Sequence, residues 1–227
     1  NVVLNTIVAE SFREIADELE KADNFDMACH DMIKKLFTEH HRIVFNGNGY
    51  SDEWVEEAER RGLPNIKSMV DAVPALTAPK AIKLFESFGV FTESELRSRA
   101  EIKYEAYAKA INIEAKSMID IASKHIIPAV VSYTTELANS VIAVSEAGVD
   151  SSTQKELLDE VTKYLKEMKA ALKKLTEVTE KASDITEGKE QATYFRDVVK
   201  VAMDELRAPA DKLEMIVDKE FWPFPSY

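Results

Sequence analysis

The chain has 227 residues, of which 45% are hydrophobic, and only six are glycine and seven proline. This length and composition exclude a disordered chain and allow one or two domains with a sizeable core. The formal net charge of −12 argues against nucleic acid or an acidic membrane surface as partner, because either would repel the chain. No run of 18 apolar residues occurs, so the sequence predicts no membrane span.

The single cysteine, Cys29, rules out an internal disulfide and favours a reducing, cytoplasmic setting. It lies inside a helical pattern, and we expect it to be buried filler and not a nucleophile. The first residues carry no basic region of the kind that opens a signal peptide. Together with the missing initiator methionine, this suggests an excised or trimmed piece of a longer chain.

The N-terminal part of the sequence predicts two amphipathic helices, at residues 2–21 and 25–41, from apolar residues at helical spacing. Three of the four histidines, His30, His40 and His41, fall on the second of them. A metal site needs three or more converging ligands, and no HExxH-type spacing is present, although Asp31 and Glu39 lie nearby. Surface or capping histidines are therefore the preferred interpretation.

A turn-rich stretch follows, in which Asn46-Gly47 and Asn48-Gly49 are expected to supply residues with positive φ. Ser51 is expected to cap a short helix that ends at Gly62. A phosphate-binding loop is rejected because the third glycine and the lysine of such loops are missing. Acidic residues in the first turn of the helix would also repel an anion.

Residues 66–73 predict one or two helical turns ended by Pro74. Residues 80–88 predict a short helix with Pro79 at its start and Gly89 at its end. The simplest role for this part is a spacer that packs on the rest of the protein.

The longest predicted element runs from Thr92 to about Val144 and begins with a capping box formed by Thr92 and Glu95. About fifty residues would make a rod on the order of 80 Å long, which must bury its apolar stripe against other helices. Pro128 is expected to kink the rod. We expect His125 to be buried and hydrogen-bonded, since it continues the heptad spacing of the stripe. Core positions are also expected for Tyr104, Tyr107 and Tyr133.

Two later segments show the alternating three- and four-residue spacing of a helical seam. The first follows a predicted capping box at 151–154 and contains Leu158, Val161, Leu165, Met168, Leu172, Leu175, Thr179 and Ala182. The second, after a turn at 183–188, contains Ala192, Phe195, Val199, Ala202, Leu206, Pro209, Leu213 and Ile216. Pro209 predicts a kink or a break near Glu205. The aromatic tail from Phe221 onward is expected to be extended and to dock on a surface.

These patterns predict an all-α protein: a long antiparallel bundle of three long helices with shorter N-terminal helices packed against it. The predicted segments are 1–91, which links to the bundle, and 92–227, which forms it. We find no carboxylate cluster on strands, no basic phosphate clamp and no Gly-rich nucleotide loop. The sequence therefore yields no catalytic, cofactor-binding or metal-binding residue.

Four strings in the sequence resemble segments of type III glutamine synthetases. The most specific is FNGNGYSDEWVEEAERRGLP at 45–64. The opening VLNTIVAE at 3–10 is similar to the segment after that family's catalytic barrel, and SRAEI with INIEA, at 98–115, is similar to its long helix. The ending WPFPSY at 222–227 is similar to its tail. The resemblance covers essentially the whole chain in the right order.

The resemblance implies a C-terminal helical region of an enzyme that makes glutamine from glutamate, ammonia and ATP with Mg or Mn bound by carboxylates. Because those carboxylates lie on strands of an upstream catalytic domain, none is carried over here, and the chain alone is expected to be inactive. Its implied partners are the catalytic domain and neighbouring subunits of a large homo-oligomer. As an alternative to a spacer role, residues 43–91 are expected to contact the catalytic domain or a neighbouring subunit.

Two other hypotheses come from different classes of protein. A free-standing helical adaptor would explain the two seams equally well, but it needs neither the Asn-Gly-Asn-Gly-Tyr-Ser stretch nor the Trp-Pro-Phe-Pro tail. A catalytic domain encoded directly upstream would favour the enzyme. A metal-dependent bundle enzyme is the weakest hypothesis, because its Glu-x-x-His pairs do not occur.

Overall fold

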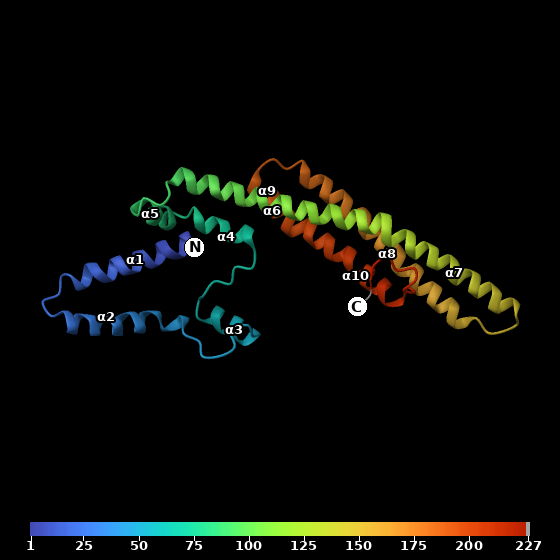
Figure 1. Cartoon of the computed structure of the whole chain (residues 1–227), viewed down its shortest axis with the longest axis horizontal. Coiled ribbons are helices and arrows are strands. Elements are labelled where there is room, and N and C mark those ends of the chain that lie inside the picture. Colours follow the sequence, from blue (N-terminus) through green and yellow to red (C-terminus); the bar gives the residue numbers. More distant parts are fainter. Residues whose placement is uncertain (226–227) are drawn as a thin grey trace. The chain divides into compact units, whose positions relative to one another are not determined.

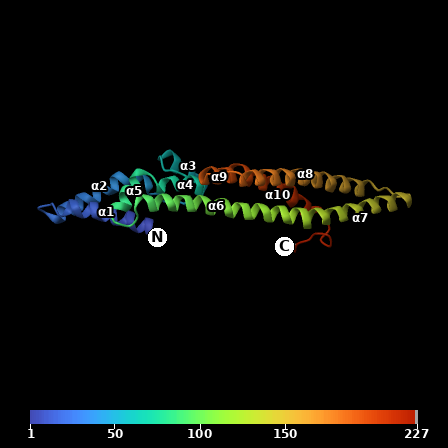
Figure 2. The ribbon, with the colours of Figure 1, turned by 90° about the horizontal axis from the view of Figure 1, so that it is seen from above.

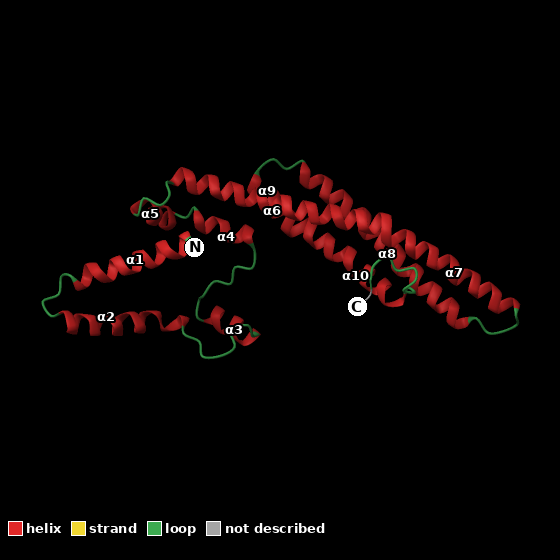
Figure 3. Cartoon of the chain, viewed as in Figure 1, coloured by secondary structure: helices red, strands yellow, loops and turns green. Residues whose placement is uncertain are grey.

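The computed structural model describes residues 1–225, and every regular element within that range is a helix (Figure 3). The all-α expectation is therefore confirmed. Contacts divide the chain into two compact units, Asn1–Ala100 and Glu101–Tyr227. The helices are α1 (Val2–Leu19), α2 (Phe25–His40), α3 (Asp52–Arg60), α4 (Met69–Leu76), α5 (Pro79–Ser87), α6 (Glu93–Ile121), α7 (Ile127–Glu146), α8 (Ser152–Ser183), α9 (Gly188–Tyr194) and α10 (Lys200–Ile216).

Three long helical segments form a bundle in the second unit, although the first of them begins with α6 at Glu93, within the first unit (Figures 1 and 2). The first segment joins α6 to α7, the second is α8, and the third joins α9 to α10. Short connections at 147–151 and 184–187 reverse the chain, and α8 packs against both α7 and α10. The three-segment topology inferred from hydrophobic spacing is thus confirmed.

The core of the bundle is the predicted pair of seams together with the inner stripe of α6 and α7. Val161, Met168 and Leu175 of α8 are completely buried, as are Val199 and Leu213 of the third segment. Leu158, Leu165 and Leu172 lie at the edge of the same core and are half-buried. Burial of this continuous apolar stripe is what makes helices of this length stable.

Each of the two composite segments contains one π turn. The first, η2 (Ala122–Ile126), ends two residues before Pro128, and the Ile127 amide donates to the Ala122 carbonyl five residues back. The irregularity expected at Pro128 therefore takes the form of a wider turn, and the helical path continues from Glu93 to Glu146. The second π turn, η3 (Phe195–Val199), was not anticipated from the sequence.

The prolines inside helices do not end them. α10 continues from Lys200 to Ile216 through Pro209, so of the kink or break expected near Glu205 the break does not occur. Leu206 and Leu213, on either side of the buried proline, pack into the core, and this packing holds the helix together despite one missing amide. The prediction that Pro74 ends its helix is wrong, because α4 continues through it to Leu76.

The predicted helix caps have mixed outcomes. The capping box at Thr92 is confirmed: the Glu95 amide donates to Thr92 Oγ1 at 3.3 Å, and the Thr92 amide donates to Glu95 Oε2 at 2.8 Å. The box predicted at 151–154 is wrong, because the Ser151 hydroxyl bonds Ser145 and not its own helix. Instead, Asp150 Oδ1 accepts from the Ser152 amide at 3.1 Å.

Glycines were expected to adopt positive φ at helix ends and in the turn at 46–49, and only the helix-end glycines do so. Gly62, Gly89 and Gly148 follow helix ends with positive φ, as a C-terminal cap requires. Gly47 and Gly49 do not have positive φ, which corrects the turn prediction. A Cβ added at Gly47 would lie 2.7 Å from the Phe45 ring, so the close approach of that ring is the reason glycine suits the position.

The first unit is built from short helices around a small core. α1 contacts α2 and α5, and α5 also contacts α4. Its buried apolar side chains are Met32, Val70, Val73, Phe85, Leu96 and Ala100. The Phe85 ring lies 5.6 Å from the Phe91 ring, and the Arg99 guanidinium lies 4.2 Å from the centre of the same Phe91 ring.

One helix in the described residues, Glu93–Glu146, has the length and composition of a membrane span in an 18-residue window. The mean hydropathy of that window is 1.2. Only 17% of the window is buried, although Val130, Tyr133 and Leu137 of this helix belong to the core of the bundle, and a single helix of this kind is weak evidence by itself.

Candidate functional site

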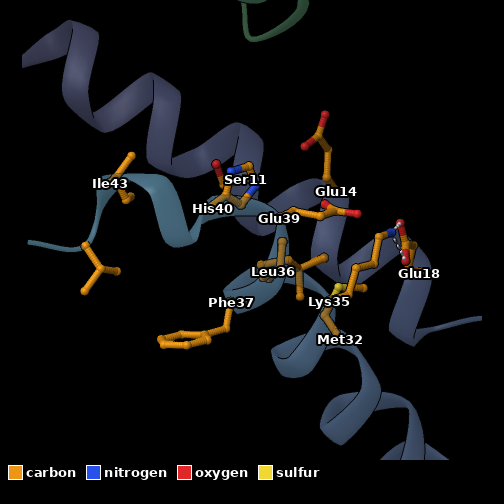
Figure 4. A pocket seen from close by; sticks show the side chains of 12 residues that line it. Ser11, Glu14, Glu18, Met32, Lys35, Leu36, Phe37, Glu39, His40 and Ile43 are labelled. Carbon is orange, nitrogen blue, oxygen red and sulfur yellow. Dashed lines mark hydrogen bonds and ion pairs between the residues drawn. The ribbon is translucent and has the colours of Figure 1, made fainter. Parts of the chain in front are cut away.

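A groove lies between α1 and α2 in the first unit (Figure 4). It has a volume of about 490 Å³, and Ile15, Met32 and Leu36 are among its apolar lining residues. Lys35 crosses between the two helices, and its Nζ lies 3.2 Å from Glu18 Oε1. The groove is thus an apolar depression edged by charged side chains.

Both helices also present apolar side chains to solvent. On α1, Leu4, Val8 and Phe12 follow each other at one-turn spacing, and Leu4 and Phe12 are each 67% exposed. On α2, Ile33 and Phe37 are one turn apart, and Phe37 is 62% exposed. We call these five residues the apolar stripes of the first unit. The expectation that α1 and α2 bury an apolar face is only partly met.

Arg61 hydrogen-bonds back to the segment after α2, and we call residues 42–61 the closed loop. Its guanidinium donates to the Val44 carbonyl at 2.8 Å and to the Arg42 carbonyl at 3.2 Å. The Phe45 ring stacks on the Trp54 ring with centroids 4.4 Å apart. Tyr50 stands at the tip of this loop and is completely exposed. A large aromatic side chain displayed on a held loop is typical of a contact residue.

Glu57 holds the closing arginine in place. Its carboxylate accepts from Arg61 Nε at 2.5 Å and from Arg60 Nε at 2.7 Å. These two guanidinium groups lower the pKa of Glu57 to about 2 from its ordinary value of 4.5. Ser51 begins α3, but its hydroxyl donates to the Asn48 carbonyl at 2.8 Å and does not cap the helix as predicted.

We expect the closed loop to loosen only in strong acid. Because the pKa of Glu57 is lower in the folded loop, its contribution is complete above pH 4.5 and is lost as the pH falls toward about 2. Fluorescence of Trp54 should therefore change between pH 4.5 and 2 in a Trp222→Phe background. Glu57→Gln should remove this transition at unchanged fold, and an unchanged titration in that variant would contradict the assignment.

The histidines and the cysteine do not assemble a reactive site. Among the described residues, no group of three or more His, Cys, Asp and Glu side chains is placed to hold a metal ion. His30, His40 and His41 are exposed, and the His41 ring packs edge-on against Phe37 with centroids 5.6 Å apart. Cys29 is half-buried and not fully buried as expected.

The expectation for His125 is wrong, because its side chain is exposed. Ala122 and Ile126 are buried in its place, since the π turn places these two residues and not His125 against the core. Tyr104 and Tyr133 are buried as predicted, and Tyr107 is half-buried against the core. These tyrosines are therefore structural residues.

Comparison with known proteins identifies the family. A family model described as the glutamine synthetase C-terminal domain matches residues 28–145, from α2 to the end of α7. The chain belongs to this glutamine synthetase C-terminal domain family. A "Glutamine synthetase" of Bacteroides fragilis is 30% identical over the whole chain, and a "Type-3 glutamine synthetase" of Dictyostelium discoideum is 41% identical over 63% of it.

The chain spans 32% of the Bacteroides relative and 20% of the Dictyostelium relative. A "Glutamine synthetase" of Butyrivibrio fibrisolvens is 41% identical over 49% of the chain and is covered over 16% of its length. The chain thus corresponds to a third or less of each of these proteins. The family match includes two of the four strings that carried the sequence resemblance, at 45–64 and 98–115, and leaves out those at 3–10 and 222–227.

Sequence reasoning missed the features of this glutamine synthetase C-terminal domain that depend on tertiary contacts. The apolar spacing of α1 and α2 was visible, but nothing in it indicated that Phe12 and Phe37 would stay exposed. The tail was expected to dock on a surface, and this is confirmed, because the Phe221 ring lies 5.5 Å from the Tyr133 ring and Trp222 packs on the core.

Proposed function

We propose that this chain is the C-terminal helical part of a glutamine synthetase, which makes glutamine from glutamate, ammonia and ATP, and that it serves assembly and not chemistry. The family match across 28–145 carries this proposal. The 20–32% coverage of two relatives supports it, since most of each relative lies outside the matched region. The cytoplasm is the proposed location, in keeping with the lone Cys29.

The divalent metal and the ATP of the reaction are assigned to the rest of the enzyme. Such ions need several converging oxygen ligands. The described residues hold no group of three or more acidic, His or Cys side chains in position for this. This chain's own residues therefore do not fit the metal site, and we assign them no step of the reaction.

The proposed contribution to assembly is a contact made by the apolar stripes of the first unit. Exposed aromatic side chains such as Phe12 and Phe37 are costly in a monomer and are frequent at the centres of protein interfaces. We infer that the catalytic part of the enzyme, or a neighbouring subunit of a homo-oligomer, covers these side chains.

The experiment replaces Phe37 by aspartate in an enzyme that joins this chain to its catalytic part. A buried interfacial charge should reduce the fraction of full-size oligomer and lower glutamine formation at least about tenfold. The measurements are light scattering after gel filtration and a glutamine assay with glutamate, ammonia and ATP. Met215→Asp is the matched control, since Met215 is 83% exposed on α10 of the other unit.

Both variants should leave the melting temperature of the 227-residue chain unchanged, because both side chains are exposed. A Phe37→Asp enzyme of normal size and activity would overturn the assembly role. Glutamine formation by the 227-residue chain alone would overturn the assignment of all chemistry to the rest of the enzyme.

A further inference from the structure

The tip of the closed loop holds Tyr50 in a fixed position. The Tyr50 amide donates to Asn48 Oδ1 at 3.1 Å, and the Ser51 amide donates to the Asn48 carbonyl at 3.1 Å, so the backbone turns tightly here. The Tyr50 side chain is completely exposed and therefore does not contribute to packing within its own chain. Because the loop is already ordered, binding a partner through this ring costs little conformational entropy.

The surface that follows Tyr50 carries negative charge. Asp52, Glu53 and Glu56 lie on α3, and all three side chains are exposed. Within the described residues none of these three carboxylates forms an ion pair, whereas Glu57 is held by two arginines. We call Tyr50 together with Asp52, Glu53 and Glu56 the acidic knob. A surface that binds it needs an apolar hollow for the ring and positive charge at the edge of that hollow.

A groove of this kind lies between α1 and α5 in the first unit. Its volume is about 610 Å³, within the range of pockets that enclose a ligand larger than one aromatic ring. Its apolar lining includes Ile7 of α1 and Ala81 and Leu84 of α5. We call this hollow the α1–α5 groove.

Two lysines give the α1–α5 groove a positive edge. Lys80 and Lys83 line the groove, are exposed, and have no acidic partner among the described residues. Arg13 also lines it, but its guanidinium is paired with Glu10. One further carboxylate of the lining, Glu14, stands against the two lysines. The groove is thus slightly positive in a chain whose net charge is −12.

We propose that the acidic knob of one copy of this chain docks in the α1–α5 groove of a second copy. Tyr50 enters the hollow, and the carboxylates of the knob lie beside Lys80 and Lys83. A second copy is the partner because one chain carries both halves of the match, an aromatic ring with an acidic flank and an apolar hollow with a basic edge.

The proposed contact joins two different surfaces and is therefore heterologous. A pair of copies retains one free knob and one free groove, so that further copies can add head to tail. The inference goes beyond the proposed function, because it links copies of this chain directly and does not involve the apolar stripes.

The test measures the size of the 227-residue chain by sedimentation velocity at about 0.15 M salt, where long-range repulsion between acidic chains is screened. The unmodified chain should associate beyond a dimer, with a dissociation constant of about 10–100 μM for one small interface. Tyr50→Ala should weaken this association at least about tenfold, and so should Lys80→Glu/Lys83→Glu. Lys166→Glu/Lys169→Glu is the matched control, because it makes the same charge change at the same spacing on exposed positions of α8.

A mixing experiment distinguishes the head-to-tail contact from a symmetric one. The Tyr50→Ala chain keeps an intact groove, and the Lys80→Glu/Lys83→Glu chain keeps an intact knob. Each variant alone should be largely monomeric, but an equimolar mixture should form a dimer that grows no further, since only one intact knob meets one intact groove. A symmetric contact would stay impaired in the mixture.

Three results would overturn the proposal. A monomeric unmodified chain at about 500 μM would mean that the knob binds something other than a second copy. Association of the Tyr50→Ala chain at unchanged strength would place the contact elsewhere, and a mixture without dimer would show that knob and groove do not meet.

A further variant separates this contact from the one proposed for the apolar stripes. Phe37→Asp should leave the association of the 227-residue chain unchanged, because Phe37 belongs to neither the knob nor the groove. Association that is lost in Phe37→Asp and kept in Tyr50→Ala would assign it to the apolar stripes and overturn the knob contact. All of the substituted side chains are exposed, so the melting temperatures should stay unchanged and lost association reports on the contact.

Discussion

Leu213→Ala is expected to lower the free energy of unfolding of the bundle by about 2–5 kcal/mol. Leu213 lies on α10, is completely buried and belongs to the core cluster that joins the three helical segments. Removing three side-chain carbons there loses apolar burial and leaves a cavity that long, mutually packed helices cannot easily close. Urea unfolding followed by circular dichroism measures the change.

Met215→Ala is the matched control for this prediction. Met215 lies two residues further along the same helix and is 83% exposed. Its replacement should change the free energy of unfolding by no more than about 0.5 kcal/mol. Equal losses in the two variants would mean that α10 does not turn its Leu213 side toward α8, and the packing described for the bundle would be wrong.

Phe85→Ala should destabilise the first unit by about 3–5 kcal/mol. Phe85 is 2% exposed and packs near Phe91 in a core of few large side chains. Because this core has so few members, one lost ring removes a large part of its apolar burial. Hydrogen–deuterium exchange should show faster exchange in α4 and α5 and unchanged exchange in α8 and α10.

The control for this variant is Phe12→Ala, which removes the same ring from a side chain that is 67% exposed. It should leave exchange in α4 and α5 as it is in the unmodified chain. If Phe85→Ala accelerated exchange in α8 and α10 as strongly as in α4 and α5, the two units would unfold as one. The division at Ala100 would then have no energetic meaning.

Residues of the bundle illustrate how far hydrophobic spacing can predict a fold. The seam from Val161 to Leu175 was assigned from its steps of three and four residues, and the structure buries Val161, Met168 and Leu175 completely. Spacing succeeds here because this long helix has one apolar face to bury, and the spacing of the apolar residues along the sequence identifies that face. The cap at Thr92 is equally local, since its partner is three residues away.

Proline and serine gave less reliable predictions because their effects depend on what packs around them. Pro209 should break an isolated helix, yet α10 runs through it, since core contacts of Leu206 and Leu213 offset one missing hydrogen bond. Serine is a residue type that often caps helices, but the Ser151 hydroxyl is hydrogen-bonded to the Ser145 hydroxyl instead. In each case a contact invisible to local spacing decided the outcome.

The sequence by itself determined the helical class, the three long segments, the seam residues of α8 and the family of this glutamine synthetase C-terminal domain. All of these follow from the spacing of apolar residues along the sequence or from long strings that resemble the family. Only the tertiary structure decided that Phe12 and Phe37 stay exposed, that His125 faces outward, and that the half-buried Trp222 packs on the bundle core. These outcomes depend on which surfaces meet, and amphipathic spacing marks a side that can be buried without saying what covers it.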